Sequence, residues 1–236
     1  MRALLDSWLG TRPRPPDHAV TSTLLAAGLL TLTLTLTACA SPPRHSRTAA
    51  GPATTTTPKG WSGAIFGAPL PKPDFTLTDT TGKPYDFKQR TRGQLALLYF
   101  GYTHCPDVCP LTMAELAQVI HTLPATVARK ITVVFVTTDP ARDTPQVLKR
   151  WLANFSPSIV GLTGNPRIIQ DAQRAVGMPP AAKESLGNGS YGVDHGAFVY
   201  AFTPDDLAHI AYPQGVKPDA LAADLRRLAT QGWSAG

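Results

Sequence analysis

The most constraining feature of the sequence is an apolar run that leads directly into a pair of cysteines. Residues 94–100 read QLALLYF, and the next ten residues, GYTHCPDVCP, contain Cys105 and Cys109. A continuous apolar run of this length predicts a strand that is buried on both faces of a sheet. The two thiols are therefore expected at the end of a central strand, where a loop leads into a helix.

Three uses of this cysteine pair compete: a structural disulfide, a redox couple and a metal site. Backbone N–H groups at a helix start stabilise negative charge, so a thiol at Cys105 ionises more easily. Residues four apart on a helix have Cβ atoms about 5–6 Å apart, which is wide for a disulfide unless the loop bends. A thioredoxin-type redox pair has two intervening residues, whereas three separate Cys105 from Cys109. This spacing favours a metal site in which both sulfurs bind one ion. A structural disulfide is the least favoured use, because closing so short a loop gains little stability.

The first 38 residues predict an export signal that ends at the remaining cysteine, Cys39. Three arginines lie among the first 14 residues, and residues 19–43 carry no charge. This order is typical of a signal peptide, and the sequence LTAC is similar to the lipobox of bacterial lipoproteins. The similarity implies cleavage before Cys39, lipidation of its thiol, and a protein that is lipid-anchored at the extracytoplasmic face of the cell membrane. A transmembrane anchor is the alternative, because about 20 apolar residues suffice to span a bilayer.

Residues 39–60 are expected to form a disordered tether, and residues 61–236 a folded domain. The tether is rich in Pro, Ala and Thr without an apolar period, so it cannot bury enough surface to become ordered. In the folded part, strand and helix patterns alternate, and Thr144 followed by Pro145 marks a helix start. The expected strands are residues 75–78, 94–100, 131–136, 159–162, 198–202 and 207–212, and the expected helices are residues 111–123, 144–155, 166–176 and 218–229.

The segment 177–192 is rich in Pro, Gly and Ser and predicts a long loop. The order of the other elements predicts an α/β protein with a central mixed β-sheet flanked by helices. Together with the cysteine pair after the first long central strand, it indicates a thioredoxin-like fold.

A metal held by two sulfurs needs at least one further ligand, and His195 is the candidate. It follows the long segment 177–192 at the entry to a strand, and in a thioredoxin-like fold that segment lies beside the cysteines. Taken alone, His195 is equally well a ligand or a structural residue. Two thiolates and one imidazole suit Cu(I) and zinc about equally. Ordinary roles in the signal, the tether or the domain surface are expected for the remaining histidines: His18, His45, His104, His121 and His209.

Three segments of the sequence resemble the Sco/SenC family. They read GYTHCPDVCPLTMAEL, VFVTTDPARDTPQVLKRWLANFSPSIVGLTG and VDHGAFVYAFTPD, in the order and spacing of that family. The resemblance implies a thioredoxin-like fold, a membrane-anchored domain outside the cytoplasm, and copper, as Cu(I), Cu(II) or both, bound by Cys105, Cys109 and His195. It also implies a reversible disulfide between the two cysteines, and a copper-receiving subunit of cytochrome c oxidase as the partner.

Several neighbours of these residues have a second interpretation. Asp194 is a candidate to orient His195, or else a surface turn residue, and Asp107 is a candidate to tune the thiols, or else a helix first-turn acid. Asp139 and Arg142 in TTDPARDT are expected to form a loop salt bridge at the sheet edge that carries the cysteine loop. Packing in the core and at its rim is expected for the nearby aromatic residues: Tyr99, Phe100 and Tyr102.

The function favoured by the sequence is a copper metallochaperone that serves the dinuclear copper site of cytochrome c oxidase. The alternative is an enzyme, a thiol–disulfide oxidoreductase that uses the same cysteines without His195. A peroxidase or a copper sensor is less favoured. The net charge of +6 is scattered along the chain, which argues against a nucleic-acid partner. We expect the protein to act as a monomer.

Overall fold

The structure is a computed structural model, and it describes residues 60–187, 190–194 and 196–234. The predicted signal peptide, the lipidation site Cys39, the tether up to residue 59, and His195 lie outside the described residues. Within the described part, no helix is both long enough and apolar enough to cross a membrane.

An eight-stranded mixed sheet forms the centre of the domain, in the order β1-β10-β9-β4-β5-β6-β2-β3. β4, β5 and β6 are parallel, whereas β9 runs antiparallel to β4 on its other side. The strands are β1 (Ala64–Pro71), β2 (Thr76–Asp79), β3 (Pro84–Asp86), β4 (Leu95–Gly101), β5 (Ile131–Thr137), β6 (Val160–Thr163), β9 (Phe198–Phe202) and β10 (Leu207–Pro213).

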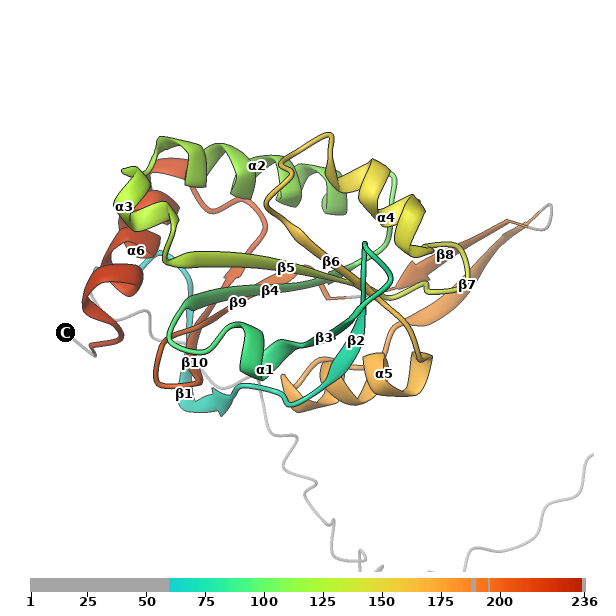
Figure 1. Ribbon diagram of the computed structural model, residues 1–236, viewed down its shortest axis with the longest axis horizontal. Helices are drawn as coiled ribbons and strands as arrows, with labels where there is room; N and C mark the ends of the chain where they lie inside the picture. The colour runs from blue at the N-terminus through green and yellow to red at the C-terminus, as the bar shows by residue number, and fades with distance from the viewer. Residues whose placement is uncertain (1–59, 188–189, 195, 235–236) are drawn as a thin grey trace, which may run out of the picture. The chain divides into compact units, whose positions relative to one another are not determined.

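Helices cover both faces of this sheet (Figure 1). On one face lie α2 (Val108–Thr122), α3 (Ala125–Ala128), α4 (Pro145–Leu152) and α6 (Pro218–Gln231). On the other face lie α1 (Phe87–Arg90) and α5 (Pro166–Ala175). The predicted fold class, a central mixed sheet flanked by helices, is therefore confirmed.

The apolar run at the centre of the sequence forms β4, and every residue of this strand is buried. Leu97 and Tyr99 belong to the core cluster under α2, while Leu98 and Phe100 belong to the cluster on the other face. Because successive side chains of a strand point to opposite faces, only a strand with helices on both sides buries all of them.

The predicted helix starts at prolines are observed. The Thr144 side chain accepts a hydrogen bond from the Val147 N–H at 3.3 Å, and Pro145 is the first residue of α4. Asn165 caps α5 in the same way. Proline suits the first helical position because the N–H that it lacks would have no partner within the helix.

The prediction of a long loop over residues 177–192 is wrong, because most of this segment forms an antiparallel hairpin. Its strands are β7 (Ala182–Gly187) and β8 (Ser190–Asp194), which pair with each other in a separate two-stranded sheet. All six residues of β7 are exposed. An exposed strand needs no alternation of apolar and polar residues, and the sequence AKESLG has none, so this strand could not be predicted from its pattern. The hairpin projects away from the main sheet (Figure 1).

Candidate metal centre

The cysteine pair spans the junction between β4 and α2. Cys105 lies in the connecting loop, and Cys109 lies in the first turn of α2, which begins three residues earlier than the predicted start at residue 111. The Cys109 N–H donates to the Cys105 sulfur at 3.4 Å, so the start of the helix faces that sulfur as expected. The two side chains are also hydrogen bonded to each other. The loop therefore bends enough to bring both sulfurs together.

Cys109 is the more enclosed of the two thiols. Its side chain is fully buried, whereas Cys105 is 9% exposed. The Tyr99 hydroxyl donates to the Cys109 sulfur at 3.6 Å. The hydrogen bond with Cys105 and burial together raise the pKa of Cys109, and burial and the nearby thiols raise the pKa of Tyr99. Cys109 therefore remains protonated at neutral pH until a cation displaces its proton.

The last residue of β4, Gly101, leaves room for the Cys109 sulfur. A Cβ atom at this position would lie 2.8 Å from the Cys109 sulfur, 2.8 Å from the Tyr99 ring and 3.0 Å from the Phe135 ring. Real Cβ atoms do not approach other atoms so closely. Glycine is therefore required here because the sulfur packs against the backbone of the strand end.

Asp143 ties the cysteine loop to the neighbouring strand. Its fully buried carboxylate accepts hydrogen bonds from the Thr103 N–H at 2.9 Å and the Thr103 hydroxyl at 2.6 Å. It also accepts one from the Thr137 hydroxyl at 2.6 Å, at the end of β5. No role for Asp143 was predicted from the sequence, although this residue lies in the TTDPARDT motif. His104, the next residue after Thr103, has a side chain that is 53% exposed.

The predicted ion pair between Asp139 and Arg142 is present. It also contacts the hairpin, which the sequence did not reveal. The Arg142 Nη1 donates to the backbone carbonyl of Tyr191 at 3.1 Å, and the Tyr191 hydroxyl lies 3.1 Å from both carboxylate oxygens of Asp139. The loop between β5 and α4 therefore contacts both the cysteine loop and the hairpin.

The hairpin strand β8 runs beside the cysteine loop and leads to the position of His195. Val193 is buried in the same core cluster as both cysteines, and its backbone is hydrogen bonded to the Tyr102 hydroxyl. Asp194 is the last residue of β8 and pairs in register with Ala182 of β7. The next residue, His195, lies outside the described residues, so the structure describes only the two cysteines of the predicted ligand set, which stays a prediction.

The structure also describes the other residues that were singled out near the cysteines. Asp107 is the N-cap residue of α2; its side chain is exposed and makes no capping hydrogen bond. Tyr99, Phe100 and Tyr102 are buried, as predicted.

Across the described ranges, no group of three His, Cys, Asp or Glu side chains is arranged to hold a metal ion. The two sulfurs are soft donors, which suit Cu(I) or zinc and not magnesium or calcium.

Comparison with known proteins shows to which family the chain belongs. Residues 67–230 match the family model SCO1/SenC. The chain belongs to the SCO1/SenC family. It is 34% identical over 165 residues to the mitochondrial SCO2 homologue of Bos taurus, a match that covers 70% of this chain and 62% of the bovine protein. The chain spans less than two thirds of the length of the mitochondrial relatives, and only 44% of yeast SCO2.

Solved structures of SCO1/SenC proteins share this thioredoxin-like fold. Apo Sco1 of Thermus thermophilus matches with a TM-score of 0.64 and 34% identity, covering 71% of this chain and 96% of that protein. Bradyrhizobium japonicum ScoI with copper bound matches with a TM-score of 0.59 and 34% identity, covering 69% of this chain and 98% of that protein. Yeast Sco1 with copper bound matches with a TM-score of 0.60 and 28% identity, covering 71% and 90%.

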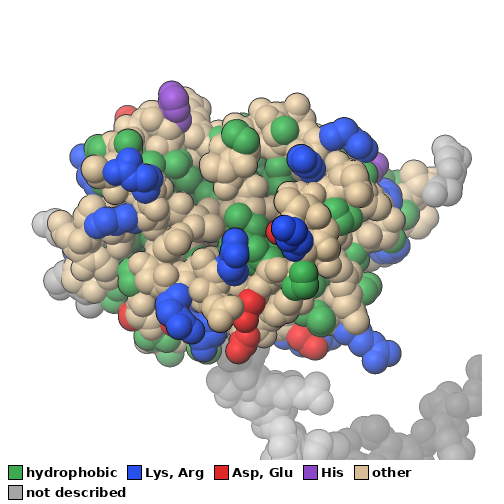
Figure 2. Space-filling view, in the orientation of Figure 1, with side chains coloured by type: hydrophobic (Ala, Val, Ile, Leu, Met, Phe, Trp, Pro, Cys, Tyr) green, Lys and Arg blue, Asp and Glu red, His purple; other side chains and the backbone are tan. Residues whose placement is uncertain are grey.

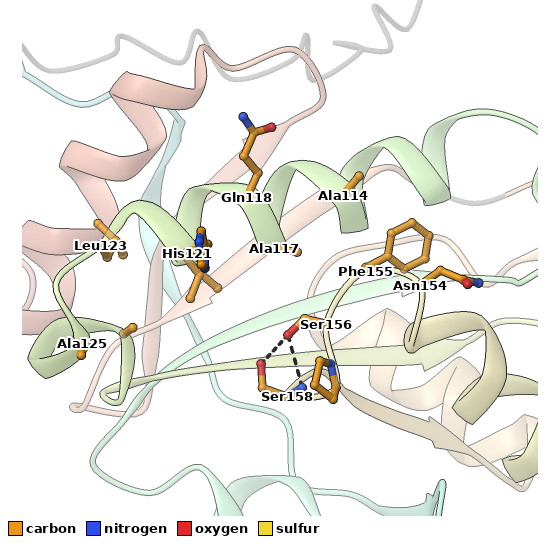
Figure 3. A pocket seen from close by; sticks show the side chains of 13 residues that line it. Ala114, Ala117, Gln118, His121, Leu123, Ala125, Asn154, Phe155, Ser156 and Ser158 are labelled. Carbon is orange, nitrogen blue, oxygen red and sulfur yellow. Dashed lines mark hydrogen bonds between the residues drawn. The ribbon is translucent and has the colours of Figure 1, made fainter.

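A groove in the described part of this SCO1/SenC domain lies away from the cysteines. It has a volume of about 750 Å³ and lies between α2, α3 and the segment after α4, lined by small side chains such as Ala114 and Ala117 and by Phe155 (Figure 3). The exposed His121 borders this groove, whereas His209 pairs with Asp205 at 2.9 Å. Lys and Arg side chains are scattered over the face shown in Figure 2 and do not gather into one patch.

Proposed function

We propose that this SCO1/SenC protein is a copper metallochaperone held at the extracytoplasmic face of the cell membrane by a lipid on Cys39. It binds copper through Cys105, Cys109 and His195, and it delivers the ion to the dinuclear copper site of a cytochrome c oxidase subunit. Copper is its cargo and does not remain as a resident cofactor.

The observation that carries this proposal is the pairing of two buried sulfurs at the start of α2. Their mutual hydrogen bond and the helix N–H on Cys105 support binding of one soft cation in place of the thiol protons. The copper-bound structures of two family members, at 34% and 28% identity, support the choice of copper over zinc. The approach of β8 to the cysteine loop supports His195 as the third ligand.

The unequal burial of the sulfurs suggests how the ion is handed over. Cys105 is the more exposed sulfur, so a donor group of the recipient reaches the ion from that side. The recipient's ligands replace His195 and Cys105 first, and the enclosed Cys109 releases the ion last. Asp194 next to His195, and Asp107 between the cysteines, add negative charge that favours the cation.

A second candidate function is thiol–disulfide exchange, and the direct hydrogen bond between the two thiols favours it. In this reaction the Cys105 thiolate attacks a disulfide of an oxidase subunit. Cys109 then displaces the second thiol, so the partner is reduced and this protein becomes the disulfide. His195 has no part in this chemistry.

The two functions are separated in cells by measuring the copper content and the activity of the oxidase. Cys105→Ala is expected to abolish copper insertion under either function. His195→Ala is expected to abolish it only if copper is carried, and to leave it intact if the protein only exchanges disulfides. His121→Ala, an exposed histidine on α2, is the matched control and is expected to have no effect. Normal copper insertion with Cys105→Ala would contradict both functions.

A further inference from the structure

The hairpin of β7 and β8 is attached to the domain at few points. Its strands pair with each other and with no other described strand. A cavity of about 510 Å³ lies between the hairpin and the sheet edge, lined by Thr138, Gln170, Ala181, Lys183 and Val193, among others. At the base of the hairpin, the Ala181 N–H donates to the buried Gln173 side chain at 3.1 Å. The attachment of its outer part therefore depends on a small number of side chains.

Tyr191 is the centre of that attachment. Its hydroxyl lies 3.1 Å from both carboxylate oxygens of Asp139, and its backbone carbonyl accepts a hydrogen bond from Arg142. The Arg142 guanidinium also stacks over the Tyr191 ring, 3.7 Å from its centroid, and the Lys183 ammonium lies 4.3 Å from the same centroid. We name the group formed by Tyr191, Asp139 and Arg142 the Tyr191 latch.

The domain side of the latch is rigid. Asp139 is 1% exposed, and its N–H donates to the Thr137 hydroxyl at 2.9 Å, at the end of the central strand β5. The Thr137 hydroxyl in turn donates to Asp143, which holds Thr103 of the cysteine loop. One short loop thus fixes the cysteine loop on one side and the hairpin on the other.

We propose that Tyr191 is a positioning residue that sets how firmly the hairpin holds His195 over the two cysteine sulfurs, and so sets the affinity and the release rate for copper. This inference rests on the proposed function, because it takes His195 as the third copper ligand. Only three residues separate Tyr191 from His195 in the sequence, so a released hairpin carries the imidazole away from the sulfurs.

Population arithmetic gives the expected size of the effect. Copper binds with its full affinity only to molecules in which the latch is closed, so the apparent dissociation constant rises as the closed fraction falls. Tyr191→Phe removes the hydroxyl from a buried carboxylate and leaves the ring under Arg142. Loss of a hydrogen bond to a charged group lowers an equilibrium constant about tenfold or more. The loss of copper affinity reaches this factor when most metal-free molecules have an open latch, and it is smaller when most are closed. We therefore expect copper affinity about three- to tenfold weaker and faster copper release.

The test is a double-mutant cycle on the full reduced chain, with Cu(I) affinity measured against a competing chelator. The cycle compares four proteins: the unsubstituted chain, Tyr191→Phe, His195→Ala and the double variant. Tyr85→Phe is the matched control, because the guanidinium of an arginine, Arg90, also lies over the Tyr85 ring, and Tyr85 lies on the edge strand β3, away from the hairpin. Amide hydrogen exchange of the metal-free protein gives a readout that does not depend on copper.

We expect Tyr191→Phe to weaken binding about three- to tenfold in the chain with His195, and less than about twofold in the His195→Ala background. We also expect faster amide exchange over residues 182–194, unchanged exchange in β4, and no effect of Tyr85→Phe. An equal loss in both backgrounds, or no loss in either, would overturn the latch. If His195→Ala alone leaves the affinity unchanged, the ligand set and the latch both fail, which is distinct from failure of the latch alone.

Discussion

The cysteine loop and the β7–β8 hairpin are held in place in opposite ways, although the proposed site draws on both. All seven residues of β4, which leads into the cysteine loop, are buried, whereas all six residues of β7 are exposed. The sulfurs therefore follow a strand that is buried throughout, whereas β8, the strand that leads to His195, pairs among the described strands only with the exposed β7. Regions with few buried contacts open locally at low free-energy cost, which suits an ion that has to be released.

The largest effect is expected from Asp143→Ala, on the rigid side of this comparison. The substitution leaves three donors without their acceptor, namely two part-buried donors of Thr103 and the buried hydroxyl of Thr137. We expect a loss of about 3–5 kcal/mol in the free energy of unfolding, measured by urea denaturation. Asp143→Asn keeps the shape and one acceptor oxygen, so it should cost less. An Asp143→Ala protein as stable as the parent would show that the cysteine loop is not held through this carboxylate.

A pair of glycine substitutions compares the two regions directly. Gly101→Ala forces a Cβ atom against the Cys109 sulfur, whereas a Cβ atom at Gly192 on β8 meets its nearest neighbour at an ordinary 3.7 Å. We expect Gly101→Ala to cost about 1–3 kcal/mol of stability and to weaken copper binding. Gly192→Ala should change stability by less than about 0.5 kcal/mol. If thermal unfolding shows an equal loss of stability for both substitutions, the proposed difference in packing between the cysteine loop and the hairpin is contradicted.

The two thiols should differ in reactivity. The hydrogen bond with Cys105 and burial raise the pKa of Cys109, and the Cys109 side chain is fully buried. We expect iodoacetamide at about pH 8 to alkylate Cys105 at least tenfold faster than Cys109, because only an accessible thiolate reacts. Peptide mass spectrometry over a time course measures both rates. Faster labelling of Cys109 would contradict the described burial of the pair.

The smallest predicted effect concerns stability at alkaline pH. The folded state raises the pKa of Cys109, so the folded protein retains a proton that the unfolded chain loses above about pH 9. This contribution to stability is complete below that pH and declines as the pH rises, by about 1 kcal/mol near pH 9.5. Urea denaturation at several pH values measures the decline. Cys109→Ser should show a shallower decline, and an unchanged slope would assign the effect to other groups.

The central layer of the fold was predictable because its signals are local. A short apolar run is enough to predict each of the buried strands β4 and β5. Likewise, the two residues Thr144 and Pro145 are enough to predict the start of α4. β1 was missed because Gly67 and its prolines interrupt the alternation of an edge strand. Asp143 and Tyr191 were missed for a different reason: their partners lie 40 and 52 residues away in sequence, and only the folded chain brings them together.

The central claim is that copper is held by two sulfurs of the rigid region and completed by His195 from the hairpin. An anaerobic titration of the reduced full-length chain with Cu(I), against a coloured competing chelator, tests it most directly. We predict tight one-to-one binding that is weakened at least tenfold by His195→Ala. Weak binding, or binding of the same strength with and without His195, would contradict the claim and leave the cysteine pair as a redox couple.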